Sequence, residues 1–232
     1  MQRVAVIAGA GPGLGASVAK RFARDGFGVA LLARNKDKLD QLRGEIEAAR
    51  GKAASIVCDL SSEASIQGAV GEVFAAFPGA AVEVVVYNPR FFARGPFLET
   101  PVAKVDEAWR VLALGGFVLV QQLLPSMLKA GRGTVIFTGA TAAMRGGAQF
   151  YPLSMPKFAV RSLAQSLARE FGPRGIHVVH AVIDGMIGQA GDTQGDSRLD
   201  PDAIADTLAQ VASQPRSAWT HELDLRPLSE SF

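Results

Sequence analysis

Cysteine and histidine are scarce in this chain of 232 residues. The single cysteine, Cys58, excludes a disulfide within the chain and a cysteine-rich zinc site. The three histidines have no acidic or cysteine partner at a spacing typical of metal ligands, so we expect no metal. Basic residues are scattered, and the formal net charge is only +2. Because nucleic-acid binders usually concentrate basic residues on one face, we expect no nucleic-acid partner.

Long hydrophobic runs are also missing. The most apolar stretch, Val111–Val120, meets two glutamines and is too short to cross a bilayer, so we expect no membrane partner. The N-terminal residues enter a strand-like run without the apolar core of a signal peptide. Hydrophobic residues make up 48% of the chain and charged residues 20%, a balance that predicts a packed core and not disorder. We therefore expect a cytoplasmic protein.

Short apolar runs alternate with segments of helical spacing along the whole chain. Strands that are apolar on both faces and alternate with helices predict a parallel sheet covered on both sides. With no linker or composition break, we predict a single α/β domain over residues 1–232. The expected strands are Val4–Ala8, Gly28–Ala33, Ala54–Val57, Val82–Tyr87, Thr134–Phe137, His177–Ile183 and Glu222–Leu225. The expected helices are Gly13–Asp25, Asn35–Arg50, a segment from Ser61 or Ser62 to Phe77, Pro101–Ala130, Phe158–Phe171 and Asp200–Gln214. Asn35, Ser61 or Ser62, and Asp200 are the expected N-terminal caps of their helices.

A glycine-rich turn follows the first expected strand. Glycine at such a place permits a tight turn, close approach of the backbone to a pyrophosphate, and close packing of helix on strand. The N-terminus of the next helix offers free N–H groups to phosphate. The turn therefore predicts a dinucleotide site, the alternative being a turn that merely needs positive φ. Its residues are Gly9, Gly11, Gly13, Leu14 and Gly15.

The residue after the second expected strand indicates which nucleotide binds. A site for NAD usually has an acid there, which accepts from the ribose 2′-hydroxyl. This chain has Arg34 instead, and a guanidinium suits the oxygens of a 2′-phosphate. We therefore expect NADP(H) to be preferred, with NAD(H) as the second choice. The alternative is an exposed arginine at the start of a helix.

At this point the chain resembles the short-chain dehydrogenase/reductase family, in matching blocks that run in order through essentially its whole length. The resemblance implies a Rossmann-type doubly wound parallel sheet, an NAD(P) cofactor, a small-molecule substrate and a homo-oligomer, either dimer or tetramer, built on the long helices. It also implies that Lys157 is the lysine of the family's Tyr-x-x-x-Lys motif. The cofactor-binding residues that it implies are Gly9, Gly13, Gly15, Asp59, Leu60, Asn88, Lys157 and Ile187.

The departures from the family pattern concern its catalytic residues. The family uses an asparagine, a serine, a tyrosine and the lysine, and the first three positions correspond here to Leu112, Ala140 and Leu153. Of the four, only Lys157 remains. The resemblance therefore implies an atypical active site that lacks most of the catalytic tetrad.

Two other hydroxyl groups are candidate proton donors. Tyr151 lies six residues before Lys157, and positions i and i+6 do not share a helix face, although a helix starting after Pro152 would leave Tyr151 in a loop. Thr138 lies near the expected serine position. His180, inside an apolar strand, is expected to be a hydrogen-bonded structural residue.

Further residues near the expected site have open roles. Tyr87 is expected to pack under the nucleotide. Arg90, which replaces a glycine of the family, could narrow the site, bind a substrate anion or face solvent.

Two functions remain open on the sequence. The first is an atypical NADP(H)-dependent oxidoreductase acting on a small, mostly apolar alcohol or ketone, such as a cyclic one. In this case a mobile loop at about 185–199, rich in glycine, would close over the substrate. The second is a non-catalytic NADP(H)-binding protein with a role in sensing or interaction.

Overall fold

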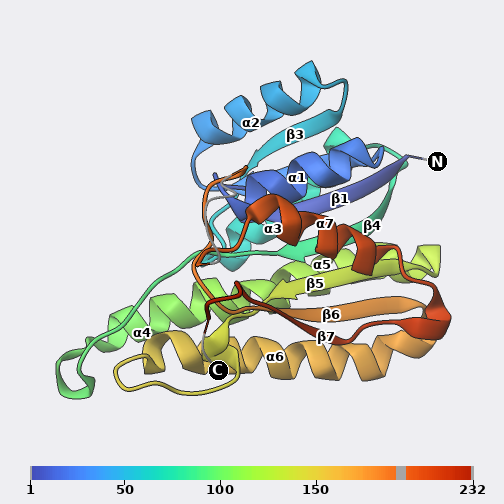
Figure 1. The fold of residues 1–232 in the computed structure, drawn as a ribbon. Coiled ribbons are helices and arrows are strands. Elements are labelled where there is room, and N and C mark those ends of the chain that lie inside the picture. The colour runs from blue at the N-terminus through green and yellow to red at the C-terminus, as the bar shows by residue number, and fades with distance from the viewer. Residues whose placement is uncertain (1, 192–196, 231–232) are drawn as a thin grey trace.

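Within residues 2–191 and 197–230, which the computed structural model describes, seven parallel strands form one sheet in the order β3-β2-β1-β4-β5-β6-β7 (Figure 1). The predicted α/β class is confirmed. The strands are β1 (Arg3–Ala8), β2 (Gly28–Ala33), β3 (Lys52–Val57), β4 (Ala81–Tyr87), β5 (Gly133–Thr138), β6 (Ile176–Ile183) and β7 (Glu222–Leu225).

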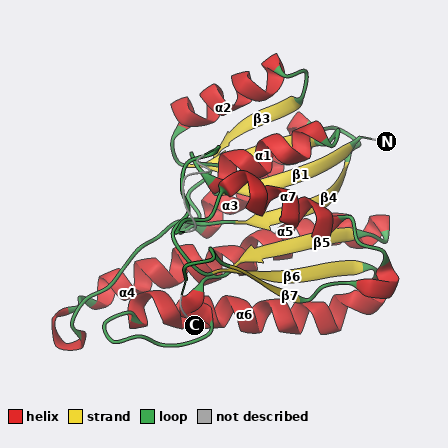
Figure 2. Cartoon of the chain, viewed as in Figure 1, coloured by secondary structure: helices red, strands yellow, loops and turns green. Residues whose placement is uncertain are grey.

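Helices cover both faces of this sheet (Figure 2). One face packs against α1, α2 and α7, and the other against α3, α5 and α6. In Figure 1, α4 and the beginning of α6 extend beyond the carboxyl ends of the strands. The helices are α1 (Leu14–Arg24), α2 (Lys36–Ala48), α3 (Glu63–Ala76), α4 (Val102–Trp109), α5 (Gly115–Ala130), α6 (Tyr151–Phe171) and α7 (Pro201–Ala212).

The central strands are buried on both faces, as the apolar runs predict. All eight residues of β6 are buried, two histidines included. Cys58, which follows β3, is also buried, and burial raises the pKa of its thiol to about 11. This thiol therefore stays protonated at neutral pH and does not act as a nucleophile.

Three polar side chains cap helix N-termini where the sequence predicts. Asn35 Oδ1 accepts from Lys38 N at 3.0 Å at the start of α2. Of the two candidate serines before α3, Ser62 is the cap. Asp200 caps α7, with Pro201 in the first helical position. Each cap satisfies a backbone N–H that has no partner within its helix.

The predicted start of α6 is wrong. This helix begins at Tyr151 and not at Phe158. Pro152 occupies the first turn, where its missing N–H costs no helical hydrogen bond, and Pro156 lies inside the helix. The seven extra residues form about two helical turns that end at Lys157, and they place Tyr151 on the helix instead of in a loop.

The predicted long helix before β5 is continuous but not uniform. A π-helical segment, Arg110–Leu114, joins α4 to α5. The whole helical stretch Val102–Ala130 is long and apolar enough to span a membrane by length and composition. The run Val111–Val120, which is too short to do so, is only part of this stretch. In the most apolar 18-residue window of this stretch, 56% is buried inside the fold. A core helix of a soluble protein meets the same criteria of length and composition.

Candidate cofactor and active site

The strand order reverses between β1 and β4, and the glycine-rich turn lies at this point. In doubly wound sheets ligands bind at such a reversal, beyond the carboxyl ends of the strands. Gly9 contacts the segment after β4 so closely that a Cβ atom would lie 2.0 Å from Asn88 O. A Cβ on Gly15 would lie 2.1 Å from Gly9 O. These two glycines are therefore required by packing.

Gly11 and Gly13 have open space around them. A Cβ atom on either would meet nothing within 4 Å, although Gly13 has φ +90°. The N-terminus of α1, which begins at Leu14, has no side-chain cap and no acidic residue in its first turn. Free N–H groups beside an open, uncharged turn fit a pyrophosphate, so the residues present are compatible with a dinucleotide.

Arg34 and Asp59 follow the neighbouring strands β2 and β3. Arg34 is exposed. Asp59 Oδ1 accepts from Ser61 N at 2.9 Å and from Ser61 Oγ at 2.8 Å. These bonds, chiefly the one from the backbone, hold the pKa of Asp59 below its usual value, and the charge of Arg34 acts in the same direction. A guanidinium and a carboxylate therefore flank the place that the resemblance assigns to the adenosine end of the cofactor, next to the buried Leu60.

Asn88 and Thr138 connect the ends of β1, β4 and β5. Asn88 Nδ2 lies 3.4 Å from Gly9 O. The Thr138 hydroxyl lies 3.2 Å from two acceptors, Asn88 Oδ1 and Tyr87 O. Tyr87 itself is buried, and its hydroxyl donates to Val111 O at 2.6 Å. Burial raises the pKa of this phenol, so it packs beneath the site as a neutral group.

Lys157 reaches the same edge from α6. Its side chain is buried, and Nζ donates to Thr138 O at 2.7 Å. Burial lowers the pKa of this amine to about 8. Lys157 is therefore a cation whose charge is sensitive to its surroundings near neutral pH.

The three residues that the resemblance assigns to the rest of the tetrad are apolar, and α6 packs against the two segments that carry the other two positions. Leu153 is partly buried in the first turns of α6, Leu112 is buried in the π-helical segment, and Ala140 lies directly before a short 3-10 helix after β5. The Tyr151 hydroxyl donates instead to Pro96 O at 3.3 Å, and its ring packs edge-on against Phe97.

A polar cluster that the sequence did not predict lies at the carboxyl end of β6. The Thr141 hydroxyl donates to Asp184 Oδ1, and Arg226 Nη1 lies 3.4 Å from the other oxygen of this buried carboxylate. Thr141 directly follows Ala140, the position that the resemblance assigns to the serine. The available signal was the position of Asp184 directly after a buried strand, but its partners come from distant parts of the chain.

The expected substrate loop lies beside this cluster. Ile187 pairs with Leu199, and Gly188 N donates to Leu199 O at 2.8 Å, so the two ends of the loop meet. Residues 192–196 of this loop lie outside the described part of the structure. Arg90, for which three roles were open, is exposed.

The histidines lie away from the glycine turn. His180 is buried and hydrogen-bonded, as expected, with Glu222 as its partner at 2.8 Å. His177 stacks on Trp219 with ring centroids 4.8 Å apart. Among the described residues, no three metal-ligating side chains gather in one place.

The comparisons with known proteins agree with this geometry. The family model for short chain dehydrogenase matches residues 3–198. The chain belongs to the short-chain dehydrogenase/reductase family. It is therefore an oxidoreductase of this type by family, with the single-domain Rossmann-like fold that the sheet shows.

Two solved structures cover almost the whole chain. A short-chain dehydrogenase from Rhodopseudomonas palustris is 37% identical, with a TM-score of 0.86, and the match covers 97% of this chain and 98% of that one. A metagenomic short-chain oxidoreductase in complex with NADP is 29% identical, with a TM-score of 0.84, covering 97% of each chain. Among curated proteins, L-2,3-butanediol dehydrogenase of Corynebacterium glutamicum is 29% identical over 202 residues, which are 86% of this chain and 77% of that protein. One of these similar proteins, the metagenomic oxidoreductase, was solved with NADP bound.

Proposed function

We propose that this short-chain dehydrogenase/reductase is an NADP(H)-dependent oxidoreductase for a small, mostly apolar alcohol or ketone, such as a cyclic one. The observation that supports it most is the position of Lys157, a buried amine at the carboxyl end of β5, one strand from the contact of Gly9 with Asn88. This position places a cation beside the strand ends where a dinucleotide would bind.

The dinucleotide would be held by residues from several strand ends. The turn at Gly9, Gly11, Gly13, Leu14 and Gly15 would hold the pyrophosphate, and Arg34 the 2′-phosphate. Lys157 would bind the nicotinamide ribose. Asp59, Leu60, Asn88 and Ile187 would contact the remainder. When bound, the nicotinamide supplies the hydride chemistry, and the protein supplies position and charge.

The substrate class follows from the three apolar side chains at tetrad positions. A hydroxyl or charge that faced Leu112, Ala140 or Leu153 without a partner would lose its water at a cost of ~1–3 kcal/mol. Apolar surface would instead gain ~25 cal/mol for each Å² buried. The relative named for L-2,3-butanediol supports a small alcohol. The loop 185–199 would close over such a substrate and exclude water.

The proton of the reaction would come from water, from a ribose hydroxyl held by Lys157, or from Thr138 or Tyr151. Thr138 is close to Lys157, because Lys157 Nζ donates to the carbonyl oxygen of Thr138. The Tyr151 hydroxyl donates to the carbonyl oxygen of Pro96. A positioned general acid typically contributes a factor of ~10²–10⁴ to the rate. We therefore propose a slow enzyme.

A second function is favoured by the apolar tetrad positions themselves. With leucine at the tyrosine position, the chain could bind NADP(H) without turning over a substrate and serve in sensing or interaction. The cofactor-side residues would then have the same roles.

Titration calorimetry with NADPH and absorbance at the reduced-nicotinamide band, with NADP⁺ and a panel of alcohols, separate these functions. We expect binding by the wild type, weaker binding by Lys157→Met, and unchanged binding by Lys129→Met, a matched control on the exposed end of α5. Turnover of cyclic alcohols supports the enzyme. Binding without any turnover supports the second function, turnover of polyols or acids alone rejects the substrate class, and failure to bind NADPH rejects both functions.

We also propose that the protein is a homo-oligomer. Large apolar side chains on α4, the π-helical segment, α5 and α6 are exposed, and monomeric proteins rarely keep such side chains together on the surface. These side chains are Trp109, Leu114, Phe117, Met155 and Phe158.

A further inference from the structure

His180 is fully buried on β6 and uses only one of its ring nitrogens. Nδ1 lies 2.8 Å from Glu222 Oε2 on β7, whereas Nε2 is buried without a hydrogen-bond partner among the described residues. An ionised carboxylate can only accept, so Nδ1 carries the hydrogen and Nε2 presents a lone pair. The ring is therefore a neutral imidazole of defined tautomer.

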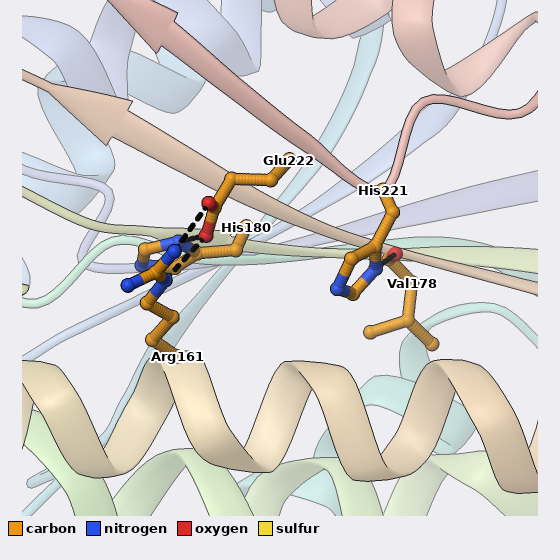
Figure 3. A network of polar contacts seen from close by, with 5 residues as sticks. All are labelled: Arg161, Val178, His180, His221 and Glu222. Atoms are coloured by element: carbon orange, nitrogen blue, oxygen red, sulfur yellow. Dashed lines mark hydrogen bonds and ion pairs between the residues drawn. The ribbon is translucent and has the colours of Figure 1, made fainter. Parts of the chain in front are cut away.

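Arg161 holds the same carboxylate from α6. Arg161 Nε and Nη2 donate to Glu222 Oε2 and Oε1, each at 2.8 Å. Figure 3 shows the side chains of Arg161 and His180 converging on Glu222, while His221 lies farther along the sheet beside Val178. The paired contact fixes the orientation of Glu222, and hydrogen bonding from Arg161 is the main cause that lowers the pKa of this carboxyl.

The sheet register and the helix period bring this network beneath Lys157. Phe137, His180 and Glu222 are direct neighbours across β5, β6 and β7. Their side chains therefore point to one face of the sheet, where α6 packs. Lys157 and Arg161 are four residues apart on α6 and share the face directed at these strands.

One peptide unit links the network to Lys157. Lys157 Nζ lies 2.7 Å from the carbonyl oxygen of Thr138, and the next residue, Gly139, packs against His180. A Cβ on Gly139 would lie 2.4 Å from His180 Nε2, so only glycine allows the ring this approach. The amine thus bonds the carbonyl oxygen of this peptide unit, and the imidazole packs against its glycine.

We propose that His180, Glu222 and Arg161 are positioning residues that set the direction and the charge of Lys157. The negative charge of Glu222 offsets the positive charge of Arg161, so the network adds almost no net charge beside the amine. His180 packs against the Thr138–Gly139 peptide, whose carbonyl oxygen accepts the hydrogen bond of the amine. This inference rests on the proposed function only where it predicts an effect on cofactor binding.

The charged groups that act on His180 support this arrangement. They are Glu222 on β7, and Lys157 and Arg161 on α6. Because burial already lowers the pKa of Lys157 to about 8, an unbalanced charge nearby would change its protonation at physiological pH.

Nuclear magnetic resonance of the full chain with ¹³C-labelled lysine tests the proposal. The Lys157 signal is the one absent from Lys157→Met, and its midpoint should lie near pH 8 in the wild type. Glu222→Gln leaves Arg161 unbalanced and should lower the midpoint by about one unit. Arg161→Gln leaves Glu222 unbalanced and should raise it. General damage to the fold would not shift the midpoint in opposite directions.

Glu83→Gln is the matched control. Glu83 also accepts two bonds from one arginine, Arg132, at 3.0 and 2.7 Å, but at the amino ends of the strands. Its variant should leave the midpoint unchanged. A midpoint unaffected by Glu222→Gln and Arg161→Gln, an equal shift in Glu83→Gln, or a wild-type His180 with its hydrogen on Nε2 would overturn the proposal.

The same samples separate this inference from the proposed function. NADPH affinity should follow the titration of Lys157, with weaker binding by Glu222→Gln at pH 8 than by the wild type. A wild type that does not bind NADPH would reject the proposed function, and the opposite shifts of the two variants would still decide the inference.

Discussion

The backbone of Gly9, after β1, lies directly against the backbone of Asn88, after β4. A Cβ atom on Gly9 would fall 2.0 Å from Asn88 O. This contact closes the turn at the point where the strand order reverses, and it leaves Gly11 on the open side. Within one motif, glycines that packing requires are thereby separated from a glycine with open space around it.

Alanine substitutions should reveal that separation. Gly9→Ala adds a clash to a backbone with φ +90° and should destabilise the fold by at least ~2 kcal/mol in urea denaturation. Gly11→Ala meets no atom within 4 Å and should change stability by no more than ~0.5 kcal/mol, yet weaken NADPH binding in calorimetry. Equal stability losses in the two variants would contradict the packing argument, and full NADPH affinity in Gly11→Ala would contradict its cofactor role.

Cofactor preference should depend on Arg34. Because a charge-assisted contact with the 2′-phosphate is available only to NADP(H), the wild type should bind NADPH roughly ten- to a hundredfold more tightly than NADH. Arg34→Asp should erase or reverse this ratio, as measured by calorimetry with both nucleotides. Arg24→Asp, at the exposed end of α1, is the control and should keep the ratio. A wild type that prefers NADH would disprove the assignment.

Stability above neutral pH should depend on Lys157. Its pKa is about 8 in the folded chain, whereas the ordinary value for lysine is 10.5, so the folded state binds fewer protons between these pH values. Stability should therefore rise with pH from about 8 to 10.5, by an amount on the order of 3 kcal/mol. Lys157→Met should be more stable than the wild type at pH 7 and should lose this rise. Denaturation curves of the two proteins that stay parallel across this range would contradict the buried amine.

Association should depend on the exposed apolar side chains of α5. Phe117 is 45% exposed on this helix, and Phe117→Glu places a charge there that cannot be buried without a partner. We expect light scattering to show a wild-type oligomer and a variant shifted toward monomer. Phe74→Glu, on α3 with 39% exposure, controls for the loss of an exposed aromatic ring. A wild-type monomer at micromolar concentration would contradict the proposed assembly.

The fold class, the glycine turn and the helix caps could all be predicted from the sequence alone. These features depend on local patterns, because strands apolar on both faces need helices on both sides, and a cap needs only a side chain near its own helix. The start of α6 was predicted seven residues too late, after both Pro152 and Pro156. Pro152 lies in the first turn, where its missing N–H costs no helical hydrogen bond, whereas Pro156 is tolerated inside the helix.

Which polar side chains meet could not be predicted from the sequence, because their partners lie far apart along the chain. Arg161 reaches Glu222 across 61 residues, His180 reaches Glu222 across 42, and Thr141 reaches Asp184 across 43. These pairings depend on the register of parallel strands, and the register is set by crossover connections whose packing no local pattern reveals. The position of Lys157 could be read from the chain, whereas the charges that surround it exist only because β5, β6, β7 and α6 fold together.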